Sequence, residues 1–460
     1  MDYRSGPGQG RIGQSSQPAI KRVHAGGRPS QEGRASSLRK LARREVSARG
    51  NWAFKRASSE EKFRNFSLQG EYDTFDAKAV HLERLAFLKR RSRIVEIVAA
   101  KDLLFTLAHS GACAAICLAE SRRRLCYMNV GSEEVIRSLF FNKNNDSLIT
   151  VSVYAHDNFS SLKCRSTPLE YIRRGQPSEG FALFESESLR WPGFVEFDDV
   201  NGKVLTYSAE NGMYKVFDLR NYTLLYSVPD KNIQEIKISP GIMLLIYNRA
   251  DGHVPLKILS IEDGAVLASF VQLLQRGKKV DFIEQFNEKL LVKQENENLH
   301  ILDVRTRVEA QVSRTEFMTP SAFIFLYENQ LFLTFRNRAV AVWNFRGEMV
   351  TAFEDHVLWY PDCNTNNIYI TSDQDLIISY CKQEELSHAP HVGTINISNI
   401  LTGKLLAKIS SVPELAQAKS KSVLSTVREA LEDVTALFYD EDRNEIYTGN
   451  RNGFVHVWTN

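Results

Sequence analysis

The chain has 460 residues, of which 43% are hydrophobic and 25% are charged, and its formal net charge is +3. This composition is typical of a globular protein with a large core, and it argues against a fibrous or wholly disordered chain. No apolar run approaches the roughly 18 residues of a transmembrane helix, and the N-terminus lacks the apolar core of a secretory signal, so we expect neither membrane insertion nor secretion.

Residues 1–50 are predicted to form a disordered basic tail. They are rich in Gly, Ser, Arg and Gln and carry 11 Lys/Arg against 3 Asp/Glu, so the remaining chain is net acidic. Such a segment has too little apolar surface to offset the entropy lost on ordering. Its paired basic residues indicate a nuclear signal, a weak nucleic-acid contact or a solubilising tail, and an organelle transit peptide is less favoured. We therefore expect a nuclear or cytoplasmic protein; the basic residues are Lys21, Arg22, Arg39, Lys40, Arg43 and Arg44.

Residues 51–93 are predicted to link this tail to the folded body. Aromatic residues such as Phe63 and Tyr72 can pack onto that body. The apolar spacing of residues 80–88 fits both a helix and a strand, so periodicity does not assign it.

From residue 94 onward, short apolar strands alternate with turn signals about every 8 to 12 residues. The strands group into units of about 40 to 50 residues, which is the mark of a repeat architecture. The clearest unit contains residues 205–220, in which Asn211-Gly212 joins two strands as a hairpin turn. The pattern predicts one all-β domain over residues 94–460.

The number of units predicts a ring of seven or eight blades, with eight favoured. Seven units have four strands each, while the last unit, residues 434–458, has only three. A closed ring needs a fourth strand there, and residues 68–90 are the candidate to supply it. Seven blades remain an alternative because the long second and seventh units can be divided differently.

One helical insertion is predicted near residues 415–433. Its apolar residues recur at helical spacing, which favours packing against the rim of the ring, although an exposed partner-binding helix has the same pattern. The stripe consists of Val423, Leu424, Val427, Ala430 and Leu431.

The units from about residue 94 to residue 460 resemble WD-repeat (WD40-like) β-propeller proteins. The family usually ends a blade strand in Trp-Asp, and the corresponding pairs here are Phe217-Asp218, Leu302-Asp303, Trp343-Asn344 and Trp458-Thr459. Gly-His openings are nearly absent, so the repeats are degenerate. The resemblance implies a propeller that binds other proteins as a scaffold of a multiprotein complex.

A narrower resemblance concerns the blade ends. In one subset of the family these read aromatic-Asp-x-Arg, and those proteins dock on the propeller adaptor of cullin-RING ubiquitin ligases and present substrates. An Arg just past a strand can form bidentate bonds with a partner, although Asp can equally cap the turn while Arg pairs locally. The candidate partner-binding residues are Phe217, Asp218, Arg220, Asp303, Arg305 and Arg346.

No motif of a known catalytic or nucleotide-binding site occurs in the sequence. His388 and His391 lie beside two glutamates, but this set is too small for a metal site. The six dispersed cysteines predict small buried side chains. We therefore expect no enzyme activity, no cofactor and no metal. A propeller enzyme with acids matched around the ring stays as a further alternative.

Overall fold

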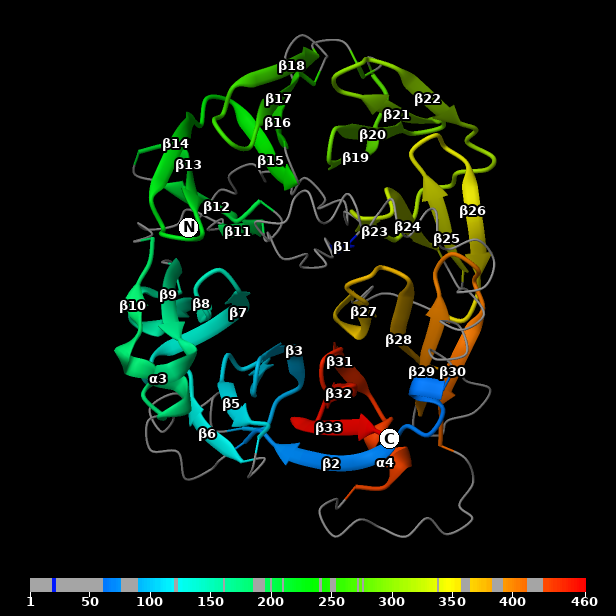
Figure 1. Ribbon diagram of the computed structural model, residues 1–460. Coiled ribbons are helices and arrows are strands. Elements are labelled where there is room, and N and C mark those ends of the chain that lie inside the picture. The colour runs from blue at the N-terminus through cyan, green and yellow to red at the C-terminus, as the bar shows by residue number, and fades with distance from the viewer. Residues whose placement is uncertain are drawn as a thin grey trace, which may run out of the picture.

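Eight sheets, each built on four antiparallel strands, stand side by side in a ring in the described part of the chain (Figure 1). The prediction of eight blades is therefore confirmed. The computed structural model describes residues 19–21, 61–75, 90–119, 123–159, 162–184, 195–198, 201–208, 211–239, 242–248, 254–270, 273–274, 277–336, 339–356, 365–382, 392–411 and 425–460.

Blades 1 to 4 follow one another along the chain, and in each blade the strands run from the inside of the ring to the outside. Their strands are β3 (Ile94–Ala100), β4 (Leu103–Ala108), β5 (Cys113–Cys117) and β6 (Arg124–Tyr127); β7 (Glu134–Asn142), β8 (Ser147–Tyr154), β9 (Leu162–Pro168) and β10 (Phe181–Ala182); β11 (Val195–Asp198), β12 (Lys203–Ser208), β13 (Met213–Asp218) and β14 (Leu224–Pro229); and β15 (Ile233–Ser239), β16 (Ile242–Tyr247), β17 (Leu256–Ser260) and β18 (Val266–Phe270).

Blades 5 to 7 repeat this order, and blade 8 takes its outer strand, β2, from the N-terminal side. Their strands are β19 (Val280–Phe286), β20 (Lys289–Gln294), β21 (Leu299–Asp303) and β22 (Glu309–Val312); β23 (Ala322–Leu326), β24 (Leu331–Arg336), β25 (Ala339–Asn344) and β26 (Met349–Phe353); β27 (Ile368–Ile370), β28 (Leu376–Lys382), β29 (Gly393–Asn399) and β30 (Leu405–Ile409); and β31 (Val434–Asp440), β32 (Glu445–Asn450), β33 (Phe454–Thr459) and β2 (Ser67–Asp73).

The ring closes where β2 pairs antiparallel with β33. Leu68 lies opposite Trp458, and Tyr72 lies opposite Val455. Trp458 is fully buried in a cluster that also contains Phe63. Within the expected closing segment, residues 68–90, the closing strand is limited to β2, which begins one residue earlier; residues 76–89 lie outside the described part of the chain. The pairing of β2 covers an edge that would otherwise be open to another chain.

The core lies between neighbouring blades, so the inner strands are buried on both of their faces. β4 is buried along its whole length, and so are the first five residues of β16. The cluster between blades 3 and 4 joins Leu205 and Val216 to Ile236 and Met243. Continuous apolar runs are expected where both faces of a strand are covered, which is why strict alternation is weak in these strands.

A helical turn at residues 61–63, the helices α3 and α4 and three single-turn 3-10 helices accompany the strands in the described residues. The helix α4 (Val427–Ala430) falls within the predicted insertion and begins with a capping box of Thr426 and Glu429. It ends at Ala430, earlier than the predicted residue 433, because Glu432 enters a β-bridge with Val392. The rest of the predicted helix, residues 415–424, lies outside the described residues. The other helices are α3 (Leu169–Arg173), η3 (Ala155–Asp157), η4 (Pro177–Glu179) and η5 (Thr365–Asn367).

The predicted tail is described only at β1 (Ala19–Lys21), which lies parallel to β23 as a fifth strand of blade 6. The remaining basic tail residues and the pair His388 and His391 lie outside the described residues. Among the helices that the structure describes, none is long and apolar enough to cross a membrane.

Candidate functional site

The turns of the propeller fall on two opposite faces because the four strands of each blade alternate in direction. The turn between the first and second strands and the turn between the third and outer strands share one face, which we call the turn face. The predicted Asp and Arg residues all lie at the turn between the third strand and the outer strand, in blades 3, 5 and 6. The structure therefore brings these residues to one face but keeps them in separate blades; they are Asp218, Arg220, Asp303, Arg305 and Arg346.

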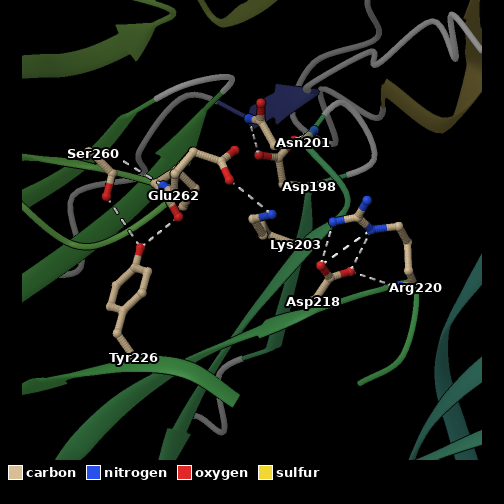
Figure 2. A network of polar contacts seen from close by, with 9 residues as sticks. Asp198, Asn201, Lys203, Asp218, Arg220, Tyr226, Ser260 and Glu262 are labelled. Carbon is tan, nitrogen blue, oxygen red and sulfur yellow. Dashed lines mark hydrogen bonds and ion pairs between the residues drawn. The ribbon is translucent and has the colours of Figure 1, made fainter. Parts of the chain in front are cut away.

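In blade 3, Arg220 forms a local pair with Asp218 (Figure 2). The Asp218 carboxylate accepts the backbone N–H of Arg220 at 2.8 Å, and Arg220 Nη2 lies 2.8 Å from Asp218 Oδ2. The hydrogen bond from Arg220 lowers the pKa of Asp218. The Asp218 side chain is only 8% exposed, whereas that of Arg220 is 72% exposed. The carboxylate thus caps the turn and holds the guanidinium in solvent.

A buried lysine supports this turn from within the sheet. Lys203 lies opposite Asp198 on β11 and opposite Asp218 on β13, so three charged residues form a row across the blade. Its side chain is 5% exposed, and its Nζ lies 3.2 Å from the Glu262 carboxylate of blade 4 (Figure 2). Its charge contributes to the lowered pKa of Asp218. Sequence reasoning missed Lys203, although its place at the start of the second strand was a usable signal.

Blade 5 repeats the arrangement with Lys289 and Asp303. Lys289 lies opposite Asp303, with its Nζ 2.5 Å from the carboxylate, which also caps the turn through the backbone N–H of Thr306. Burial works to raise the pKa of Asp303, but the bonds from Lys289 and Thr306 lower it to about 2. Arg305 pairs with Glu288 at 2.6 Å and is 64% exposed. Blades 3 and 5 therefore share an internal lysine, a capping aspartate and an exposed arginine.

Blade 6 keeps the turn without the charged pair. The Asn344 side chain accepts the backbone N–H groups of Arg346 and Glu348 at 2.9 and 3.0 Å, and it donates to the Glu348 carboxylate at 2.7 Å. Asparagine can cap a turn as aspartate does. Arg346 is accordingly exposed in the same position as Arg220 and Arg305.

Phe217, the aromatic residue of the predicted motif, does not lie on the exposed surface of the turn. Its ring is partly buried, and its centroid lies 4.6 Å from that of Phe184 in the neighbouring blade. Phe217 therefore contributes to packing between blades 2 and 3, while the exposed part of the motif is Arg220.

Blades 3 and 4 are joined at the same face by Tyr226. Its hydroxyl donates to the carbonyl oxygen of Ile261 at 2.9 Å, and a weaker contact reaches Ser260 (Figure 2). Gly264 lies against the tyrosine ring with φ at +73°, and a Cβ at this position would lie 2.8 Å from Tyr226 Cδ2. Only glycine therefore fits this turn without displacing the ring.

We expect Gly264→Ala to lower the free energy of unfolding by about 2–4 kcal/mol, because it adds a clash to an unfavourable backbone conformation. Gly212→Ala is the matched control, since Gly212 has a φ of +58° with no atom near its missing Cβ. Gly212→Ala should lower the free energy of unfolding by only about 1–2 kcal/mol, from backbone strain alone. Denaturant titration of both variants measures the difference, and equal losses would contradict the proposed contact with Tyr226.

Buried histidine, serine, threonine and tryptophan side chains bond one another within blades and between blades 6 and 7. His356 Nδ1 lies 2.6 Å from Ser379 Oγ, and burial lowers the pKa of His356 to about 3. Trp343 and Trp458 donate to threonines of the adjacent strand. His356 and Ser379 resemble a base and a nucleophile, but both are buried, so neither meets a substrate in solution in this conformation. Among the described residues, no group of three or more His, Cys, Asp or Glu side chains is placed to hold a metal ion.

The arrangement defines the chain as an eight-bladed β-propeller with a charged turn face. The chain belongs to the family described as a domain of unknown function (DUF7899), whose model matches residues 51–458. This match does not name WD repeats, so the resemblance seen in the sequence extends to the propeller fold and no further.

Solved structures that match the chain include two of low sequence identity. The computationally designed Ika8 protein is 17% identical, with a TM-score of 0.48, and the match covers 81% of this chain and 97% of that one. BamB from Moraxella catarrhalis is 12% identical, with a TM-score of 0.44, and the match covers 86% of this chain and 100% of that one. No curated protein matches the chain.

Proposed function

We propose that this propeller is a non-catalytic scaffold that holds proteins of a multiprotein complex through its turn face. The observation that carries the proposal is the shared presentation of Arg220 and Arg305, which are 72% and 64% exposed beside carboxylates of their own blades. Turns on a rigid frame commonly carry binding residues. We place the protein in the nucleus or the cytoplasm, with the basic tail as a weak nucleic-acid contact.

The local ion pairs prepare these arginines for a partner. A guanidinium has five N–H donors, and Asp218 engages only the Nε and Nη2 nitrogens of Arg220. Because the carboxylate fixes the side chain, less conformational entropy is lost when a partner carboxylate or carbonyl binds. Local pairing and partner binding are therefore compatible at these turns.

We expect the triple variant Arg220→Ala, Arg305→Ala, Arg346→Ala to recover at least tenfold less partner protein than the unaltered chain. Affinity purification followed by quantitative mass spectrometry measures this recovery. Hydrogen bonds of charged groups contribute about 1.5–3 kcal/mol each, so the loss of two is sufficient. Arg451→Ala is the control, because Arg451 is equally exposed but lies in the second turn of blade 8, on the opposite face. Unchanged recovery with the triple variant, at an unchanged melting temperature, would end the proposal for this face.

A second candidate is a substrate receptor of a cullin-RING ubiquitin ligase. It is favoured by the common construction of blades 3 and 5, where a lysine lies opposite the capping aspartate on the neighbouring strand and an exposed arginine follows the aspartate. Binding of the purified propeller adaptor to the intact chain and to the Arg220→Ala, Arg305→Ala variant tests it. Absence of binding, or equal binding by both proteins, would exclude this candidate while leaving the broader scaffold intact.

A further inference from the structure

The outer strands of blades 3 to 6 begin with apolar side chains that face solvent. These side chains are between 39% and 67% exposed, and they directly follow the turns that carry Arg220, Glu262, Arg305 and Arg346. Since β14, β18, β22 and β26 form the outside of four consecutive blades, the residues lie along one arc of the rim (Figure 1). We call them the apolar arc; they are Leu224, Leu225, Val266, Leu267, Val308, Met349 and Val350.

A repeated β-bulge explains why two neighbouring residues are exposed together. In blade 3, Phe217 pairs with Leu224 and Val216 pairs with Tyr226, so Leu225 is the extra residue. The same shift occurs in blade 4 at Leu267 and in blade 6 at Val350. A bulge breaks the alternation of a strand and redirects its side chains. The apolar pairs thus recur in blades 3, 4 and 6, whereas the outer strand of blade 5 has no bulge and contributes Val308 alone.

Blade 1 shows how this position is covered when the chain supplies a cover. Its bulge places Leu125 at the equivalent position, and the helix α3 from blade 2 lies against β6 there. Leu125 packs against the cluster that contains Leu169 and Ile172 of this helix. On its polar side, Arg173 binds Asp102, a residue of the turn face, at 2.5 Å. In blade 1, Leu125 is thus covered by a short amphipathic helix. The apolar residues of this helix are three apart, and one of its arginines pairs with an aspartate of the turn face.

The charges beside the apolar arc are the reverse of those at blade 1. In blade 1 the turn face carries Asp102 and the helix α3 carries the arginine that pairs with it. In blades 3, 5 and 6 the turn face itself carries exposed arginines. The carboxylates of these turns have local partners, as Arg220 and Arg305 do: Glu262 pairs with Lys203, Glu309 with His300 and Glu348 with Asn344, and Asp263 accepts the backbone N–H of Ala265. The two guanidinium groups are nevertheless 72% and 64% exposed and have N–H donors beyond those that their own carboxylates engage. An occupant of the arc therefore gains from carboxylates that meet these arginines.

We propose that the apolar arc binds an amphipathic helix of a partner protein. Apolar side chains at i and i+3 or i+4 of that helix cover the arc, and its Asp or Glu residues pair with Arg220, Arg305 or Arg346. Exposed apolar side chains bordered by charged residues are typical of a protein-binding site. This inference rests on the proposed scaffold function and specifies the chemistry of the partner.

Site-specific crosslinking in the full chain tests the proposal. A photoreactive amino acid replaces Leu225 or Leu267, and in the control it replaces Val130, which is 43% exposed and lies in the connection between blades 1 and 2 on the opposite face. Mass spectrometry then identifies the crosslinked peptides. We expect peptides with apolar residues three or four apart and flanking Asp or Glu, at yields at least fivefold above the Val130 control.

The charge-reversed variant Arg220→Glu, Arg305→Glu, Arg346→Glu should reduce these crosslinks at least fivefold, because the partner carboxylates would then be repelled. Crosslinks to a second copy of the chain, to nucleic acid or to peptides without this pattern would overturn the proposal, as would yields equal to those at Val130. If purification recovers partners but the arc does not crosslink to them, only this inference fails. If purification recovers no stoichiometric partner, the scaffold function fails with it.

Discussion

A chain that begins at residue 76 should lose the cooperative thermal transition that a chain beginning at residue 60 retains. The shorter chain lacks β2, so the edge of β33 and the fully buried Trp458 become exposed. It also lacks Phe63, whose ring packs 5.5 Å from that of Tyr439. Removal of one such aromatic side chain costs about 3–5 kcal/mol. With the lost strand pairing, the total approaches the stability of about 5–15 kcal/mol of a typical domain.

The chain beginning at residue 60 is the control, because it also lacks the basic tail and β1 but keeps the closing strand. Differential scanning calorimetry compares the two chains. A synthetic peptide of residues 60–76 should restore the transition of the shorter chain when added in excess, since it can occupy the place of β2. An unchanged transition in the shorter chain without the peptide would contradict the role of β2 in closure.

The fold was predictable because its signals are local and repeated. Each hairpin carries its own turn residues, as at Gly212, and each strand is apolar, so the repeat length and the blade number can be read from neighbouring residues. The missing strand of the last blade also followed from counting. The helix α3 was not foreseen: it has five residues, and its apolar pair Leu169 and Ile172 is too short a pattern to distinguish from a loop.

The candidate site was predictable only in part, because its roles depend on register across strands. Hairpin pairing places Lys203 opposite Asp218 and Lys289 opposite Asp303, which the linear sequence does not display. Phe217 has the composition of a binding motif but packs between blades. Leu225 is exposed because a β-bulge makes it the extra residue of its strand. The sequence does not reveal the bulge, so sequence analysis treats Leu225 as an ordinary residue of an alternating strand.

We expect Lys237→Met to lower the free energy of unfolding by about 3–5 kcal/mol, because it removes one partner of a buried ion pair. Lys237 on β15 and Glu284 on β19 join the inner strands of blades 4 and 5, with Nζ 2.6 Å from the carboxylate and side chains only 9% and 2% exposed. Lys237 also donates to the carbonyl oxygen of Ile283 at 2.8 Å. Loss of the ammonium leaves a desolvated negative charge at the boundary of two blades.

The double variant Lys237→Met, Glu284→Gln separates the cost of a stranded charge from the cost of altered packing. Since the glutamine is neutral and of similar size, the double variant should recover most of the stability lost in the single variant. Lys257→Met on β17, where the lysine is only partly buried, should change stability by less than about 1 kcal/mol. Equal losses in the single and double variants would show that Lys237 acts through packing and that the charge of Glu284 is tolerated without it.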